Sequence, residues 1–124
     1  MPTKKIAVIG GGTMGSGISL TAATNGIHAV VVDVNEVQLS KAKMYHEKQC
    51  ARAVLKERMT QEESDVAVSK LSYVSSMQEA EGVDWAIEAA TENVAIKKKL
   101  FIQMQDTFED SVVLATNTSS ISIT

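Results

Sequence analysis

A glycine-rich segment near the amino terminus constrains the fold of this chain more than any other feature. Its glycines stand at positions 10, 12 and 15, the spacing G-x-G-x-x-G, and it follows the apolar run 6–9. Between a strand and a helix, the first glycine permits a tight turn and the second lets a pyrophosphate approach the backbone, while the third allows close packing of the helix. The N–H groups that begin the helix face the phosphates. We therefore predict a dinucleotide-binding loop made of Gly10, Gly12, Thr13, Met14 and Gly15.

An acidic residue follows at the expected distance. Asp33 ends the apolar run 29–32 and lies 18 positions after Gly15. A carboxylate there can accept hydrogen bonds from the adenosine ribose hydroxyls and repels a 2′-phosphate. The next residues, 34–36, include no Arg or Lys that would compensate such a phosphate. The pattern favours NAD over NADP, and the alternative is a glycine-rich turn that binds nothing.

Short β-branched runs alternate with longer helical patterns along the chain, which is typical of parallel βαβ units. We expect strands at residues 6–9, 29–32, 71–74, 85–89 and 112–115. Helices are expected at 13–25, from 36 to about 59, from 60 to about 69, and from about 93 to 108. Thr60 and Glu63 fit a capping box that begins the third of these. The predicted fold is α/β, a Rossmann-type doubly wound parallel sheet with a helical hairpin inserted after the second strand.

The last expected helix carries an apolar stripe, with Ile96, Leu100 and Met104 at a spacing of four residues. Phe101 and Phe108 lie beside this stripe. Such a face is expected to cover the sheet.

Length and composition exclude several classes of protein. The 124 residues allow one domain, and a single cysteine allows no intramolecular disulfide. No Cys/His cluster has the spacing of a zinc site. The net charge of −3 argues against nucleic acid as a partner, and no apolar run approaches the roughly 20 residues that span a bilayer. We expect a soluble, intracellular protein without membrane insertion, in a compartment that the sequence leaves open.

Two polar clusters, at residues 88–93 and 116–120, follow the fourth and fifth expected strands, at the edge where ligands bind in open α/β sheets. With these clusters, the chain resembles the NAD-binding domain of the L-3-hydroxyacyl-CoA dehydrogenase family, which includes 3-hydroxybutyryl-CoA dehydrogenases. The resemblance covers nearly the whole chain. It rests on residues 6–18, Asp33, 87–93, 97–101 and 115–124, and the Asn-Thr-Ser-Ser segment at 117–120 is its most specific part.

The resemblance implies oxidation of an L-3-hydroxyacyl-CoA to the 3-ketoacyl-CoA with hydride transfer to NAD, in fatty-acid β-oxidation or butanoate metabolism. By position, Ser119 resembles the residue that hydrogen-bonds the 3-oxygen of the substrate. Asn117 resembles a residue with a catalytic role that also binds the cofactor, and Glu92 and Lys97 resemble cofactor contacts on the nicotinamide side.

The same resemblance implies a contact with the coenzyme A part of an acyl-CoA substrate. Lys56, in the extended helix, resembles a family lysine that reaches the coenzyme A phosphates. At the other family contact in that helix, usually a serine, this chain has Gln49. A lysine on a helical hairpin is otherwise a solvated charge.

Oxidation of an alcohol needs a base, and neither histidine of this chain suits that role. His28 is expected at the amino end of the second strand, the wrong edge for the cofactor, and His46 within the long helix. We interpret each as a surface or lightly packed histidine. In the family, the catalytic histidine, its glutamate partner and a helical domain that forms a homodimer follow the Asn-Thr-Ser-Ser segment. We therefore expect residues 1–124 to be one NAD-binding domain, truncated before the C-terminal helical domain, that binds NAD but is inactive alone.

Three other interpretations remain open. A non-catalytic dinucleotide-binding module would not need the polar segment at 117–120. The NAD-binding domain of another β-hydroxyacid or polyol dehydrogenase would explain the glycine loop but not that segment. A part of a multifunctional β-oxidation protein would explain both.

Overall fold

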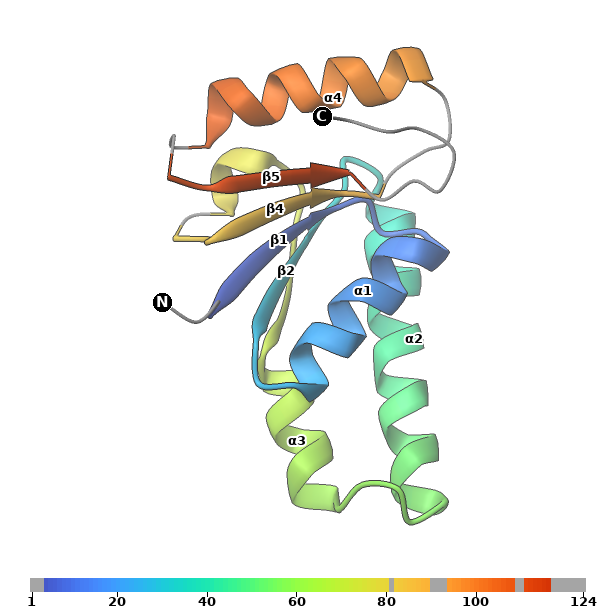
Figure 1. Cartoon of the computed structure of the whole chain (residues 1–124). Coiled ribbons are helices and arrows are strands. Elements are labelled where there is room, and N and C mark those ends of the chain that lie inside the picture. Colours follow the sequence, from blue (N-terminus) through green and yellow to red (C-terminus); the bar gives the residue numbers. More distant parts are fainter. Residues whose placement is uncertain (1–3, 81, 90–93, 109–110, 117–124) are drawn as a thin grey trace.

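Five parallel strands form one sheet in the order β3-β2-β1-β4-β5 (Figure 1). The strands are β1 (Lys5–Ile9), β2 (His28–Val32), β3 (Leu71–Val74), β4 (Trp85–Glu88) and β5 (Val113–Thr116). This computed structural model describes residues 4–80, 82–89, 94–108 and 111–116. The strand order changes direction at β1, which pairs with β2 on one side and β4 on the other. The prediction of a doubly wound parallel sheet is confirmed.

The helices lie on both faces of this sheet. They are α1 (Thr13–Thr24), α2 (Glu36–Leu55), α3 (Gln61–Ser69), the short 3₁₀ helix η1 (Met77–Glu79) and α4 (Val94–Thr107). Figure 1 shows α1, α2 and α3 on one side of the sheet and α4 on the other. The hairpin of α2 and α3 between β2 and β3 confirms the predicted insertion.

Capping interactions fix where the hairpin helices begin and end. Thr60 Oγ1 accepts a hydrogen bond from Glu63 N at 3.1 Å, and Thr60 N donates to Glu63 Oε1 at 2.9 Å, as a capping box requires. The helix α2 ends at Leu55, earlier than the expected residue 59. The cause is Glu57, whose φ of 58° places it in the left-handed region that terminates helices.

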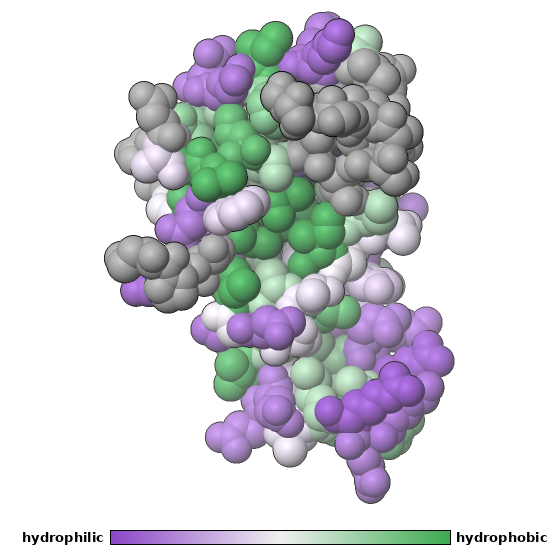
Figure 2. All heavy atoms as spheres, viewed as in Figure 1, coloured by the Kyte–Doolittle hydropathy of each residue, from purple (hydrophilic) through white to green (hydrophobic). Residues whose placement is uncertain are grey.

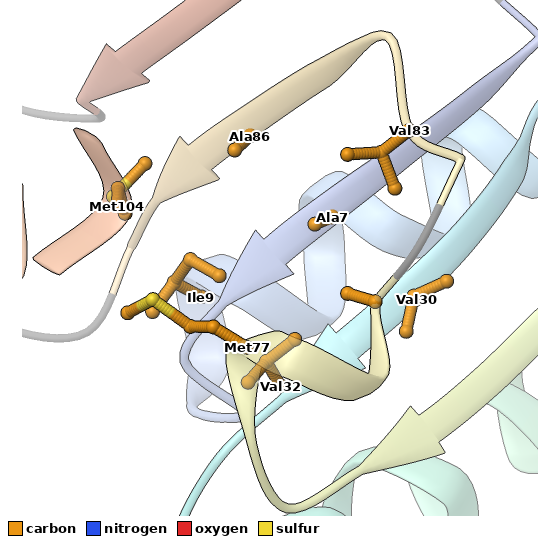
Figure 3. Close-up of a cluster of buried hydrophobic side chains, with 9 residues drawn as sticks. Ala7, Ile9, Val30, Val32, Met77, Val83, Ala86 and Met104 are labelled. Carbon is orange, nitrogen blue, oxygen red and sulfur yellow. The ribbon is translucent and has the colours of Figure 1, made fainter. Parts of the chain in front are cut away.

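The core occupies both faces because consecutive residues of each buried strand point to opposite sides. On the α4 side, Ala7, Ile9, Val30, Val32 and Ala86 pack with Met77 and Met104 (Figure 3). On the other side, strand residues such as Ile6, Val8 and Ala29 pack against α1, α2 and α3. Burial on both faces explains why these strands read as continuous apolar runs.

The predicted stripe of α4 is only partly buried. Met104 is 0% exposed and Leu100 packs on the core, but Ile96 is 47% exposed. In Figure 1 the first turn of α4 extends past the carboxyl ends of β4 and β5. Among the helices of the described part of the chain, none is both long and apolar enough to cross a membrane.

Candidate functional site

The glycine loop joins the end of β1 to the start of α1. Gly10 has a φ of 122°, a conformation that residues with a side chain rarely adopt. Its N–H donates to the Val32 carbonyl at 2.7 Å, which fixes the loop beside the end of β2. The tight turn predicted at the first glycine is therefore present.

Gly15 and Gly12 lack side chains for different reasons. A Cβ at Gly15 would lie 1.8 Å from the Gly10 carbonyl oxygen, so the close contact of α1 with the loop requires glycine there. At Gly12, none of the described atoms lies within 4 Å of the position that a Cβ would occupy. The described residues leave that space open, and a ligand that approaches the backbone there would meet a Cβ of any residue other than glycine.

The amino end of α1 faces this open space. Gly12 is the N-cap residue, and within the described residues no side chain caps the helix. Met14 is 53% exposed, and Thr13 is exposed as well. The first N–H groups of a helix have no partner inside it and carry partial positive charge. This arrangement can hold an anionic group such as a pyrophosphate.

Asp33 lies directly beside the loop, at the end of β2. Its Oδ2 accepts a hydrogen bond from Gly11 N at 2.8 Å, and its Oδ1 accepts one from Asn35 N at 2.9 Å. These two bonds fix the orientation of the carboxylate. An ionised carboxylate has about four acceptor positions, so two remain for hydroxyl donors.

A pocket of about 270 Å³ opens next to Asp33. Its lining includes Val34 after β2, Met77 of η1, and Leu100 and Gln103 of α4. An apolar pocket with a few polar groups is the usual environment of a planar ring such as adenine. No sequence pattern indicated this pocket. The rule that ligands bind at the carboxyl edge would have drawn attention to the loop after β3, although not to α4.

The residues predicted on the nicotinamide and substrate side belong mostly to segments outside the described residues. This holds for Glu92, Asn117 and Ser119, and for the side chain of Lys97, whose backbone belongs to α4. The strands that precede these segments end together, because Glu88 of β4 is in register with Ile9 of β1 and with Thr116 of β5.

The two histidines lie away from this edge, but one of them differs from its prediction. His28 is at the amino end of β2, as expected, and its Nε2 is 2.9 Å from Ser72 Oγ. His46 is 0% exposed and bonded on both ring nitrogens, so the prediction of a surface or lightly packed residue is wrong. The burial of His46 depends on tertiary contacts. Its hydrogen-bond partners come from α1 and β3, and the residue spacing within α2 does not reveal them.

The buried histidine makes stability depend on pH. Burial lowers the pKa of His46 below its ordinary value of 6.5, and burial and nearby lysines do the same for His28. The unfolded chain therefore binds protons at a higher pH than the folded chain. We expect the free energy of unfolding to decrease as the pH falls below about 6.5 towards the folded pKa values. Urea unfolding at several pH values above 5 measures this decrease.

A His46→Gln variant provides the control, because its side chain does not titrate. We expect a shallower pH dependence in this variant, with the remaining slope due to His28. An equal slope in both proteins would show that His46 does not contribute. Glu79 and Asp84 act at lower pH, because their carboxyl pKa values are lowered from ordinary values of 4.5 and 3.8.

Lys56 lies at the far end of the hairpin. It is the C-cap of α2, a helix of 20 residues and thus about 30 Å long that begins near Asp33. The structure therefore does not bring Lys56 to the glycine loop. Lys56 lines a second pocket, of about 390 Å³, together with Arg52, Arg58 and Gln49. Figure 2 shows hydrophilic residues gathered at this end of the molecule.

In the described part of the chain, no three His, Cys, Asp or Glu side chains gather where they could hold a metal ion. The only cysteine, Cys50, is buried. The site described above consists of the open space at Gly12, a fixed carboxylate and an adjoining apolar pocket.

Comparison with known proteins gives a consistent result. The family described as 3-hydroxyacyl-CoA dehydrogenase, NAD binding domain, matches residues 5–124. A probable 3-hydroxybutyryl-CoA dehydrogenase of Bacillus subtilis is 37% identical over 124 residues, which are 100% of this chain and 43% of the relative. A peroxisomal fatty acid β-oxidation multifunctional protein of Arabidopsis thaliana is 34% identical, over 98% of this chain and 17% of its own length.

A solved structure shows the same similarity. The crystal structure of 3-hydroxybutyryl-CoA dehydrogenase from Escherichia coli superposes with a TM-score of 0.94 at 33% identity. The match covers 99% of this chain and 26% of that one. In each of these three comparisons, the chain spans less than half the length of the similar protein.

Proposed function

This chain belongs to the NAD-binding domain family of the 3-hydroxyacyl-CoA dehydrogenases, and from that premise we propose that it holds NAD for the oxidation of L-3-hydroxyacyl-CoA thioesters to 3-ketoacyl-CoA. The observation that carries the proposal is the open space at Gly12 in front of the uncapped start of α1. NAD, when bound, accepts the hydride that leaves the substrate. Every other contribution described below comes from residues of the chain.

In this proposal, the first N–H groups of α1 bind the pyrophosphate, with Gly10, Gly12, Thr13, Met14 and Gly15 forming the loop around it. The fit rests on the helix start, which offers unpaired donors to an anion. Packing alone requires glycine at position 15, whereas a Cβ at Gly12 would meet none of the described neighbouring atoms within 4 Å, so the absence of a side chain at Gly12 is what supports a ligand there.

Asp33 selects the cofactor in this proposal. Its remaining acceptor positions take the hydroxyls of the adenosine ribose, and the adjoining pocket takes the adenine. A 2′-phosphate would face the charge of Asp33, and residues 34–36 offer no cation in compensation. We therefore expect NAD to bind more tightly than NADP.

The substrate side of the proposal rests on position in the family pattern. Ser119 hydrogen-bonds the 3-oxygen of the substrate, Asn117 lies beside substrate and cofactor, and Glu92 and Lys97 contact the nicotinamide side. The common end of β1, β4 and β5 supports this, because the segments that follow these strands start at one edge.

The proton acceptor of the reaction comes from outside residues 1–124 in this proposal. His28 stands at the opposite edge of the sheet, and both ring nitrogens of His46 are engaged in the interior. We propose that the complete enzyme is a homodimer and that its further domain supplies the base. The chain alone then binds NAD without turnover.

The direct test is titration of the purified chain with NAD and NADP by calorimetry, together with an assay for NADH formed from 3-hydroxybutyryl-CoA. We expect binding of NAD, much weaker binding of NADP, and no NADH. Formation of NADH would contradict the inactive state of the chain. Absence of NAD binding by the folded chain would contradict the proposal as a whole.

The coenzyme A part of the substrate has a candidate contact in Lys56. With Arg52 and Arg58, it surrounds the pocket at the end of α2 with positive charge. We expect Lys56→Gln to weaken binding of coenzyme A about threefold, since an exposed charge pair is worth up to about 1 kcal/mol. Calorimetry measures this effect, with Lys48→Gln, an exposed lysine of the same helix, as the control. Equal effects of the two substitutions would rule out a specific role for Lys56.

A further inference from the structure

A buried polar network connects the hairpin to the first turns of α1. The His46 side chain comes from the middle of α2 and is completely enclosed. Its Nε2 is 2.9 Å from the Ser16 carbonyl oxygen and 2.9 Å from Ser19 Oγ. On the opposite side of the ring, Nδ1 is 2.6 Å from the hydroxyl of Tyr73 in β3. One imidazole of α2 therefore bonds to two other elements, α1 and β3.

The geometry fixes the proton positions in this network. The Ser16 carbonyl can only accept a hydrogen bond, so Nε2 of His46 carries the hydrogen. In a neutral ring Nδ1 is then an acceptor, and the Tyr73 hydroxyl donates to it. Ser19 Oγ donates its hydrogen to the Gly15 carbonyl at 2.7 Å, so its lone pairs can accept. The Nε2–H of His46 is therefore shared between Ser19 Oγ and the Ser16 carbonyl.

The network continues into the glycine loop. Ser16 Oγ donates to the Gly11 carbonyl at 3.2 Å, and Gly11 N donates to Asp33 Oδ2 at 2.8 Å. A chain of hydrogen bonds thus runs from Asp33 through Gly11 and Ser16 to His46. Ser16 and Ser19 lie in the first two turns of α1, so the bonds of His46 attach α2 to the end of that helix which faces the open space at Gly12.

The neutral ring fits these surroundings. Burial lowers the pKa of His46, and burial with nearby Glu47 and Cys50 raises the pKa of Tyr73 to about 12, so both groups are uncharged near neutral pH. Every buried polar side-chain atom of the described residues has a hydrogen-bond partner. A fully satisfied network of this kind holds its members in one arrangement.

We propose that His46 is a positioning residue for the cofactor: its Nε2–H tautomer holds the start of α1 so that the helix N–H groups meet the pyrophosphate. The inference rests on the proposed function, because it concerns the same loop. It gives α2 an indirect role in phosphate binding, without any contact between α2 and the cofactor.

The test compares variants that keep or remove the bonds of the ring. We expect His46→Leu to weaken NAD binding about tenfold, the loss of roughly one well-formed hydrogen bond to a phosphate. His46→Gln, whose amide can donate to Ser16 and accept from Tyr73, should bind within about threefold of the original chain. Val68→Ala is the control, because it removes packing at a half-buried residue of α3 and lowers stability but leaves the hydrogen bonds of His46 in place.

A second ligand distinguishes an effect on the position of the α1 start from a general loss of structure. Adenosine, followed by NMR titration, occupies the ribose and base positions but has no phosphate. We expect His46→Leu to leave adenosine binding unchanged and Val68→Ala to leave both ligands unchanged. Equal NAD binding by His46→Leu and the original chain would overturn the inference, as would equal weakening of NAD and adenosine.

Two further outcomes are distinguishable. If His46→Leu does not fold, Ser19→Ala and Tyr73→Phe each remove one partner of the ring, and unchanged NAD binding in both would overturn the inference. If the original chain binds no NAD, the proposed function itself fails and the inference falls with it.

Discussion

Gly15→Ala is expected to destabilise the chain by about 3 kcal/mol or to prevent folding, and to abolish NAD binding in either case. The added Cβ would lie 1.8 Å from the Gly10 carbonyl oxygen, and the atom it meets is backbone that cannot rotate away. The start of α1 must therefore move off β1. Urea unfolding, followed by the fluorescence of the single tryptophan, Trp85, measures the loss of stability.

Gly12→Ala is the matched control, because its Cβ meets none of the described atoms within 4 Å. We expect its free energy of unfolding to stay within about 1 kcal/mol of that of the original chain. Alanine is a weaker N-cap than glycine, which destabilises the fold, but it also lowers the entropy of the unfolded chain, which stabilises the fold. NAD affinity should nevertheless fall roughly 100-fold, because the methyl group occupies the place of the pyrophosphate. Unchanged NAD affinity in Gly12→Ala would contradict the proposed position of the phosphates.

Asp33→Ala is expected to weaken NAD binding by about 100-fold and to reduce the preference for NAD over NADP. The first effect follows from the loss of charge-assisted hydrogen bonds to the ribose, and the second from the removal of the charge that repels a 2′-phosphate. Calorimetric titration with both cofactors measures the two effects together.

The carboxylate also accepts hydrogen bonds from Gly11 N and Asn35 N, so part of the loss of NAD affinity in Asp33→Ala is structural. Asp33→Asn separates these contributions, because it keeps one acceptor oxygen but no charge. We expect Asp33→Asn to lose less stability than Asp33→Ala, because its amide oxygen still accepts from one of the two N–H groups, and to lose the preference for NAD. A full preference for NAD in this variant would show that the charge of Asp33 does not select the cofactor.

Local patterns were sufficient to predict much of the fold. The apolar runs of β1 and β2 predicted central strands, because both faces of these strands are buried. The Thr60 and Glu63 pair predicted the start of α3 through a contact between residues three apart. The spacing of Asp33 from Gly15 predicted a carboxylate beside the loop, because the length of the βαβ unit fixes where its second strand ends.

Features built from distant segments were not predicted. His46 gave no sign of burial, because its partners Ser16, Ser19 and Tyr73 lie 27 to 30 positions away. The pocket beside Asp33 combines side chains of η1 and α4, and η1 itself is too short to show a helical period. The roles of Glu92, Lys97, Asn117, Ser119 and Lys56 stay predictions.

The central position of β1 has a consequence for the order in which the chain folds. Ile6 pairs with Ala29 of β2, 23 positions away, but also with Trp85 of β4, 79 positions away. The entropy lost on closing a loop increases with its length, and sheets made of distant strands form slowly. We therefore expect β1, α1 and β2 to form a nucleus, with β4 and β5 joining afterwards. The glycine loop lies within that nucleus, so the half of the site proposed to bind the phosphates is assembled before the half proposed to face the substrate.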